Sequence, residues 1–161
     1  WTAKAAAQGV APAEFNLGLQ YYLGQGVPQD FARAAHWYTK AAAQGDASAE
    51  YDLGVDYDAG QGVPQDYAQA AYWFAKAAAQ GNALAEYNLG ALYAGGQGVP
   101  QDYVDAYKWM VLAKASSAPA SAAYKDASAG MSTLAPRMTP AQISAAQAAA
   151  ARWRRMREKK P

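Results

Sequence analysis

The chain has 161 residues, an alanine-rich hydrophobic fraction of 52% and no cysteine, which suits one compact domain or one short repeat array. The lack of cysteine excludes disulfides, thiolate metal sites and cysteine nucleophiles, and no apolar run approaches the roughly 18 residues that a transmembrane segment needs. The net charge of +1 is unevenly divided. Residues 1–115 hold 6 basic and 11 acidic side chains, whereas residues 116–161 hold 8 basic and 2 acidic ones. This asymmetry bears on partners more than on the fold.

A seven-residue motif, GQGVPQD, recurs with a constant offset of 36, at residues 24–30, 60–66 and 96–102. A fixed period between about 20 and 50 residues is the signature of a solenoid. The motif is glycine-rich but lacks the Lys-Ser/Thr pair of a phosphate-binding loop, so we interpret it as the turn between two helices. A tryptophan series keeps the same period: Trp1, Trp37, Trp73 and Trp109.

The elements follow from this period in chain order. Residues 1–9 match the later stretch that begins at Trp37, so they are predicted to be a partial helix of a preceding repeat. Each full repeat then predicts two helices, with Asp and Asn residues as N-caps. The first helices are expected at about 11–23, 47–59 and 83–95, and the second at about 31–44, 67–80 and 103–117. We place the repeats at 10–45, 46–81 and 82–117.

Two features of these helices predict how they pack. Gly18, Gly54 and Gly90 lie in the middle of the first helices, where glycine costs about 1 kcal/mol relative to alanine; we therefore expect a neighbouring helix that passes too close for a Cβ atom. Along the second helix, Trp37 shares a face with Phe31, Ala34 and Ala41, a stripe typical of burial. The tryptophans at this position are therefore expected to be buried, and Trp73→Ala to cost about 3–5 kcal/mol.

The end of the chain departs from the repeat. Leu112 stands where the earlier second helices have lysine, as expected of a solenoid terminus. Residues 118–161 predict a two-helix cap. The first helix is expected at about 122–134, and the second begins with a capping box at Thr139 and extends to about residue 157. The basic run at 152–160 suits an acidic partner, anionic lipid or nucleic acid, or a helix end that frays into solvent. The acidic repeats argue against nucleic acid, and docking of the tail onto them, intramolecular or homotypic, stays open.

The middle repeat carries Leu53-Gly54, Tyr57, Gly60, Gly62-Val63, Asp66, Ala70, Trp73, Lys76-Ala77-Ala78 and Gly81. This pattern resembles the Sel-1-like repeat, a relative of the tetratricopeptide solenoids. The resemblance implies an all-α fold, an α/α superhelical solenoid of antiparallel hairpins, and a bacterial scaffold or adaptor for protein–protein interaction. Some exported members carry a cysteine pair in each repeat, which this chain lacks. A periplasmic or exported location is slightly favoured over a cytoplasmic one.

In such solenoids the first helices line the concave side, which suggests a peptide groove. Aromatic rings would contribute apolar area there, and amides would pair with the backbone of an extended peptide. The alternative is that Phe15, Tyr51 and Tyr87 pack between neighbouring first helices. The first helices hold no Lys or Arg, so a clamp for an acidic C-terminal peptide has no cationic donors. The predicted partner-binding residues are Phe15, Asn16, Leu19, Tyr22, Tyr51, Asp52, Val55, Asp58, Tyr87, Asn88 and Ala91.

The remaining polar residues give no catalytic, cofactor or metal site. The recurring Glu14, Glu50 and Glu86 fit the first turn of a helix, where the helix dipole favours a carboxylate. Together with the aspartates of the second repeat they do not supply the six or more oxygens that calcium prefers. We therefore interpret these carboxylates as a solvated or partner-facing patch. His36 lacks a nucleophile and is expected at the surface or in packing. Two alternatives to an adaptor remain: an exported cell-wall-related enzyme or small-ligand binder, which a deep pocket with a perturbed carboxylate would favour, and an architectural fragment of a larger repeat protein.

Overall fold

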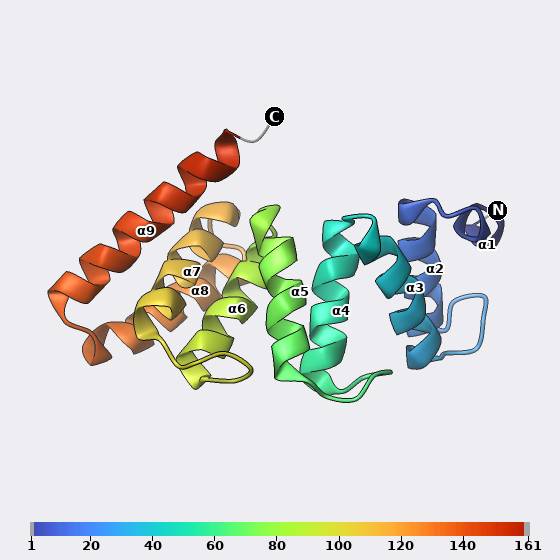
Figure 1. Cartoon of the computed structure of the whole chain (residues 1–161), viewed down its shortest axis with the longest axis horizontal. Coiled ribbons are helices and arrows are strands. Elements are labelled where there is room, and N and C mark those ends of the chain that lie inside the picture. Colours follow the sequence, from blue (N-terminus) through green and yellow to red (C-terminus); the bar gives the residue numbers. More distant parts are fainter. Residues whose placement is uncertain (1, 160–161) are drawn as a thin grey trace. The chain divides into compact units, whose positions relative to one another are not determined.

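The structure, a computed structural model, describes residues 2–159, so Trp1 and the last two residues of the basic tail lie outside the described residues. Within that range the chain is entirely helical, with nine α-helices, one short 3₁₀-helix and no strand (Figure 1). The α-helices are α1 Thr2–Ala7, α2 Ala11–Leu23, α3 Phe31–Ala43, α4 Ala47–Ala59, α5 Tyr67–Ala79, α6 Ala83–Gly95, α7 Tyr103–Ser116, α8 Ala122–Leu134 and α9 Pro140–Glu158. The 3₁₀-helix η1, Ala135–Arg137, follows α8 directly.

The first helices of the repeats (α2, α4 and α6) have the predicted bounds, and the second helices (α3, α5 and α7) end one residue earlier than predicted. The cap side chains explain these bounds. Asp46 accepts from the backbone N–H of Ala49 at the start of α4, and Thr139 and Gln142 form the predicted capping box of α9. Each such bond satisfies a backbone donor that the helix itself leaves unpaired.

The GQGVPQD motif is a turn, as predicted. Gly24 and Gly26 have φ angles of +68° and +76°, which end α2 in the left-handed region that favours glycine. The motif's glutamine then ties the turn to the helix before it, because Gln29 Nε2 donates to the carbonyl of Tyr22 at 2.8 Å. The same bond recurs from Gln65 and from Gln101. The motif is therefore a structural connection that each repeat copies.

The mid-helix glycines contact the second helix of their own hairpin, which confirms the predicted close approach. A Cβ atom on Gly18 would lie 2.7 Å from the ring of Tyr38, and one on Gly54 would lie 2.6 Å from the ring of Phe74. Real Cβ atoms do not approach carbon this closely, so each glycine makes room for an aromatic ring.

Burial was predicted for the tryptophans of the second helices, and this prediction is wrong for two of the three. Trp37 and Trp73 are half-buried, while the next residues, Tyr38 and Phe74, are each 1% exposed and occupy the core. Ala34 and Ala41 of the predicted stripe are buried as expected, but the aromatic residue that joins them in the core is the one after the tryptophan. The indoles lie at the edge of the stripe under the ammonium groups of lysines. Trp109 alone of the three is buried, because the ring of Trp153 from α9 packs against it at 5.2 Å.

The chain forms two compact units, residues 1–76 and 77–161, which divide within α5. In the first unit α3 packs against both α2 and α4. In the second unit α7 is central and contacts α6, α8 and α9 (Figure 1). The repeat boundaries proposed from the sequence stay a prediction.

Candidate functional site

The first unit contains a cavity of about 140 Å³ between α2, α3 and α4. We call it the acidic pocket, and its lining residues are Leu19, Tyr22, Tyr38, Asp52, Val55 and Asp56. Four of these six belong to the predicted partner-binding residues, namely Leu19, Tyr22, Asp52 and Val55. The structure therefore brings together side chains from two successive first helices and adds a ring from the second helix between them.

Asp56 is the unusual member of the acidic pocket. Its side chain is 2% exposed, and its Oδ2 atom has no hydrogen-bond partner. Burial raises the pKa of Asp56 to about 7, and the charge of Asp52 adds to the shift. Burial likewise raises the pKa of Asp52 to about 6, with a smaller contribution from Asp46. Both carboxyl groups are thus close to their protonation midpoints near neutral pH, and both would gain from a cation.

Tyr38 closes the floor of the acidic pocket. Burial raises the pKa of its phenol, and the nearby carboxylates Asp52 and Asp56 raise it further. The hydroxyl therefore keeps its proton over the physiological range and remains a hydrogen-bond donor. The ring of Phe15 packs against that of Tyr38, with the two centroids 5.7 Å apart.

The predicted aromatic residues of the first helices are half-buried and pack within their own hairpins. Phe15 contacts Tyr38, and Tyr51 lies 6.0 Å from Phe74 in the same relation. The alternative in which these rings pack is therefore partly correct, although the partner is the second helix and not a neighbouring first helix. Asn16 is exposed on the same helix as Phe15, while Asp58 is half-buried and has its pKa raised by burial.

The second unit places two other predicted residues, Tyr87 and Ala91, at a cavity of about 340 Å³. Met110 of α7 and residues of α8 complete its wall, among them the exposed Asp126. The remaining predicted residue, Asn88, is half-buried on α6. This cavity contains one carboxylate, that of Asp126, where the acidic pocket contains two.

The interpretation of the recurring glutamates as a solvated patch is wrong. Glu14, Glu50 and Glu86 are 3%, 1% and 0% exposed, and each has a partner from a second helix or from α9. Glu14 accepts from Gln44 at 2.6 Å, and Glu50 forms an ion pair with Lys76 at 3.4 Å. Asp56 is also buried and therefore not solvated, so for this residue only the partner-facing alternative stays a prediction. These side chains point into the hairpin because the first turn of each first helix lies against the end of a second helix.

Glu86 obtains its partner from the basic tail. Arg157 Nη1 donates to Glu86 Oε1 at 2.6 Å, and Nη2 reaches the hydroxyl of Ser116 at 3.4 Å. Burial raises the pKa of Glu86, while Ser116 and Arg157 oppose the shift. Ser116 stands one period after Gln80 and two after Gln44, so the shorter side chain of the third repeat leaves space that the guanidinium occupies.

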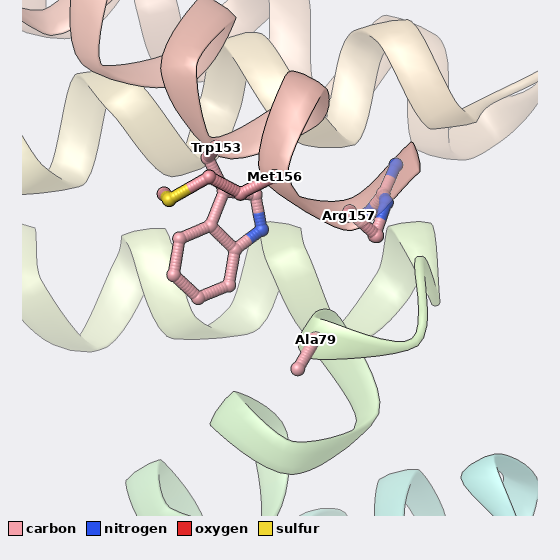
Figure 2. A pocket seen from close by; sticks show the side chains of 4 residues that line it. All are labelled: Ala79, Trp153, Met156 and Arg157. Carbon is pink, nitrogen blue, oxygen red and sulfur yellow. The ribbon is translucent and has the colours of Figure 1, made fainter. Parts of the chain in front are cut away.

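Arg157 also lines a small apolar cavity of about 160 Å³ with Trp153, Met156 and Ala79 (Figure 2). Trp153 and Arg157 point from α9 toward the segment that carries Ala79, whereas Met156 is 59% exposed. The interpretation of the tail as a fraying end is therefore wrong for Arg157. The tail therefore docks onto the repeats of its own chain through Arg157. A contact between the tail of one copy and the repeats of another stays a prediction.

The part of the chain that the structure describes contains no group of three or more His, Cys, Asp or Glu residues able to hold a metal ion. His36, expected at the surface or in packing, is exposed, and its ring lies 5.4 Å from that of Trp37. Between residues 2 and 159, no helix combines the length and the apolar character that crossing a membrane requires.

Two lining residues of the acidic pocket, Tyr38 and Asp56, were not predicted from the sequence as site residues. A signal for Asp56 exists in the repeat itself. The corresponding positions, one period before and one after, hold Gln20 and Leu92, and Leu92 is buried. A carboxylate at a position where another copy has a core leucine marks a residue that repeat copying does not explain.

The antiparallel hairpins and their 36-residue period define an α-solenoid of the tetratricopeptide-like class. The sequence matches the Sel1 repeat over residues 11–46, 47–82 and 83–116, and the chain belongs to the Sel1 repeat family. Proteins built from Sel1 repeats are generally helical scaffolds for protein interaction.

Two solved structures are similar. A Sel1 repeat protein from Oxalobacter formigenes has 36% identity and a TM-score of 0.69 over 75% of this chain and 49% of its own. A protective antigen with an SLR fold, present in uropathogenic Escherichia coli strains, has 32% identity and a TM-score of 0.83 over 100% of this chain and 35% of its own. The chain thus spans about half of the first and about a third of the second. A search of curated protein sequences gives no significant match.

Proposed function

We propose that this chain is a non-catalytic scaffold or adaptor that binds a peptide or protein along the exposed faces of α2, α4 and α6. Membership of the Sel1 repeat family supports the class of function. The single observation that carries the location is the acidic pocket, which is open to solvent between α2 and α4 and is lined by four of the predicted residues. Loops and helix faces that leave such hollows between repeats are the surfaces on which solenoids bind partners.

The chemistry of these faces favours a neutral or basic partner segment. Rings such as Phe15 and Tyr51 are held in place by the second helices, so they offer apolar area at little cost in conformational entropy. Exposed Asn16 and half-buried Asn88 can pair with a peptide backbone. The first helices hold carboxylates but no Lys or Arg, so peptides with acidic C-termini are not expected to bind.

A capture experiment tests this proposal. The wild type is compared with the triple variant Asn16→Ala, Asp52→Ala and Asn88→Ala. A control triple variant, His36→Ala, Gln69→Ala and Lys125→Ala, changes exposed residues of α3, α5 and α8. A partner that the wild type and the control retain and the first variant loses supports the proposal, provided that circular dichroism shows all three proteins folded. Equal recovery by all three contradicts it.

Fractionation of the source cells tests the further proposal that the scaffold works in a bacterial envelope.

The acidic pocket also favours a second candidate, a small-ligand binder or an enzyme acting on cell-wall material. Two carboxyl groups with raised pKa values in one pocket are a pattern of general acid–base catalysis. The volume of about 140 Å³ is, however, below the roughly 300–1,000 Å³ of small-molecule sites, so the scaffold is preferred. Clearing of a cell-wall suspension by the wild type, and its loss in Asp56→Asn, would support the enzyme.

A further inference from the structure

We infer that the acidic pocket is a receptor for one basic side chain, a lysine ammonium or an arginine guanidinium, that a protein partner inserts between α2 and α4. The inference rests on the proposed scaffold function and specifies the chemistry of the partner. It depends on four features of the acidic pocket: a buried carboxylate with an unpaired oxygen atom, its aromatic walls, its size, and its position in the repeat array.

The unpaired carboxylate is the first feature. Asp52 and Asp56 are four residues apart on α4 and therefore share a face of the helix, and both line the acidic pocket. Asp56 is 2% exposed, and its Oδ2 atom accepts no hydrogen bond. A buried polar atom without a partner is costly. A cation that enters the acidic pocket removes this cost, because it supplies both the opposite charge and an N–H donor.

The walls of the acidic pocket suit a side chain that is apolar along its stem and charged at its end. Leu19 and Val55 provide aliphatic surface on either side, and Tyr22 and Tyr38 provide rings. Lysine and arginine bury their methylene groups against such surfaces while the charged end reaches a polar partner. Tyrosine faces also attract cations directly.

The size and composition of the acidic pocket argue against a folded segment, a large ligand and a calcium ion. A volume of about 140 Å³ accommodates the end of one side chain and is too small for a folded segment or a large ligand. A calcium ion prefers six to eight oxygen ligands, and the described residues contain no cluster of three metal-binding side chains.

The acidic pair belongs to one place in the array. The residues one period before Asp52 and Asp56 are Asn16 and Gln20, and the residues one period after are Asn88 and Leu92. Neither copy of this position pair ionises. The partner's basic side chain is therefore expected to fix the register of the bound segment at this position of the array.

The groups that face the acidic pocket determine how binding depends on pH. They are Tyr22 from α2, Tyr38 from α3, and Asp52 and Asp56 from α4, with Asp46 acting on Asp52. No cation of α2 or α4 competes, since those helices contain no Lys or Arg, and Lys40 of α3 lies over Trp37. The cation binds the ionised carboxylates, so affinity should rise between pH 5 and pH 8 as Asp52 and Asp56 lose their protons, around pKa values of about 6 and 7.

The test is a ¹H–¹⁵N NMR titration with three blocked tripeptides, acetyl-Gly-Lys-Gly-amide, acetyl-Gly-Arg-Gly-amide and acetyl-Gly-Gln-Gly-amide. The glutamine peptide is the neutral control, and n-butylammonium represents a free amine. We expect the lysine or arginine peptide to shift the amide signals of α2 and α4 around Leu19, Asp52 and Asp56. The glutamine peptide should bind at least about tenfold more weakly, since a charged donor forms a stronger hydrogen bond to a carboxylate than a neutral amide does.

The matched variants are Asp56→Asn, Asp52→Asn and, as a control that removes an exposed carboxylate from the second unit, Glu158→Gln. Asp56→Asn should weaken the basic peptides about tenfold, and Glu158→Gln should leave them unchanged. Equal binding of the glutamine peptide, unchanged binding in Asp56→Asn, or binding of n-butylammonium without either basic peptide would overturn the inference. So would displacement of the peptides by Ca²⁺ at equimolar concentration.

The capture assay separates this inference from the proposed function. The variant Asp52→Asn with Asp56→Asn removes the charges alone, whereas Asn16→Ala with Asn88→Ala alters the faces outside the acidic pocket. A partner retained by the charge variant and lost by the amide variant overturns the receptor while the scaffold stands. A partner retained by both variants overturns the scaffold face itself. Loss of the partner in the charge variant, together with the peptide titration, supports both.

Discussion

Arg157 Nη1 lies 2.6 Å from Glu86 Oε1, so an ion pair joins the last turn of α9 to the first turn of α6 across 71 residues of sequence. Glu86 is fully buried and Arg157 is 26% exposed. In the first repeat the same glutamate position is satisfied by a neutral amide, that of Gln44. The third repeat instead uses a charged group from outside the repeats, and this contact anchors α9 on the second unit.

Arg157→Gln is expected to destabilise the protein by about 2–4 kcal/mol. The substitution leaves a buried carboxylate without its cation, which is strongly destabilising even where the pair itself contributes little. The free energy of unfolding from urea denaturation measures the effect. Arg155→Gln, at an exposed position of the same turn, should change it by less than about 0.5 kcal/mol. An equal effect of the two substitutions would show that the tail acts through net charge and not through Glu86.

Gly54→Ala is expected to cost about 1–3 kcal/mol, because its Cβ atom would lie 2.6 Å from the Phe74 ring and the core would be overpacked. Gly95→Ala, near the end of α6, is the control. Its Cβ atom would meet only the flexible side chain of Gln97, at 3.2 Å, so the better helix propensity of alanine should leave stability unchanged or raise it by up to about 1 kcal/mol. Thermal unfolding followed by circular dichroism distinguishes the two. Addition of Phe74→Leu should recover part of the Gly54→Ala loss.

Phe74→Ala is expected to cost about 3–5 kcal/mol and Trp73→Ala about 1–2 kcal/mol, because only the phenylalanine is fully buried. This order reverses the expectation from the repeat pattern, which assigned the larger loss to the tryptophan. Urea denaturation of both variants checks it. A larger loss in Trp73→Ala would mean that the indole, and not the phenyl ring, occupies the core.

Asp56→Asn is expected to remove most of the decrease in stability with rising pH. The pKa of Asp56 is about 7 in the folded chain and about 3.9 in an unfolded one. Between these values the folded state holds a proton that the unfolded state has lost, so stability falls as pH rises. The asparagine variant should therefore gain about 1–3 kcal/mol relative to the wild type on going from pH 5 to pH 8.

The melting temperatures of the two proteins at pH 5 and pH 8 measure this difference. Asp126→Asn is the control, since this exposed carboxylate should leave the pH dependence as it is in the wild type. A wild-type protein that becomes more stable toward pH 8, with Asp56→Asn parallel to it, would contradict the raised pKa.

Most of the fold follows from local signals in the sequence. Asp46, Asn82 and Thr139 mark helix starts because a short polar side chain there satisfies backbone donors nearby, and the period of 36 carries each assignment to the next repeat. The choice between Trp73 and Phe74 for the core does not follow, because both are apolar and adjacent. The tryptophan is also the residue that every repeat keeps, whereas the next position holds Tyr38, Phe74 and Met110 in turn. One residue is a rotation of about 100° around the helix, and only the position of Gly54 opposite Phe74 decides it.

The candidate site was predictable in part. The face of the first helices indicated Leu19, Tyr22, Asp52 and Val55, because they remain after the packing positions of an amphipathic helix are assigned. Tyr38 was missed because it comes from the second helix and reaches the acidic pocket only through the crossing of the hairpin. Arg157 was missed as a partner of Glu86 because no local spacing connects residues so far apart in the sequence.

The long reach of Arg157 also has a consequence for the order in which the protein can mature on the ribosome. The glutamate of the first repeat finds its amide partner after 30 further residues have been made, so this hairpin can settle while synthesis continues. Glu86 waits for 71. The third hairpin therefore carries an unneutralised carboxylate at its centre until α9 has been made, and a nascent-chain chaperone would have a longer opportunity to bind it than to bind the first hairpin.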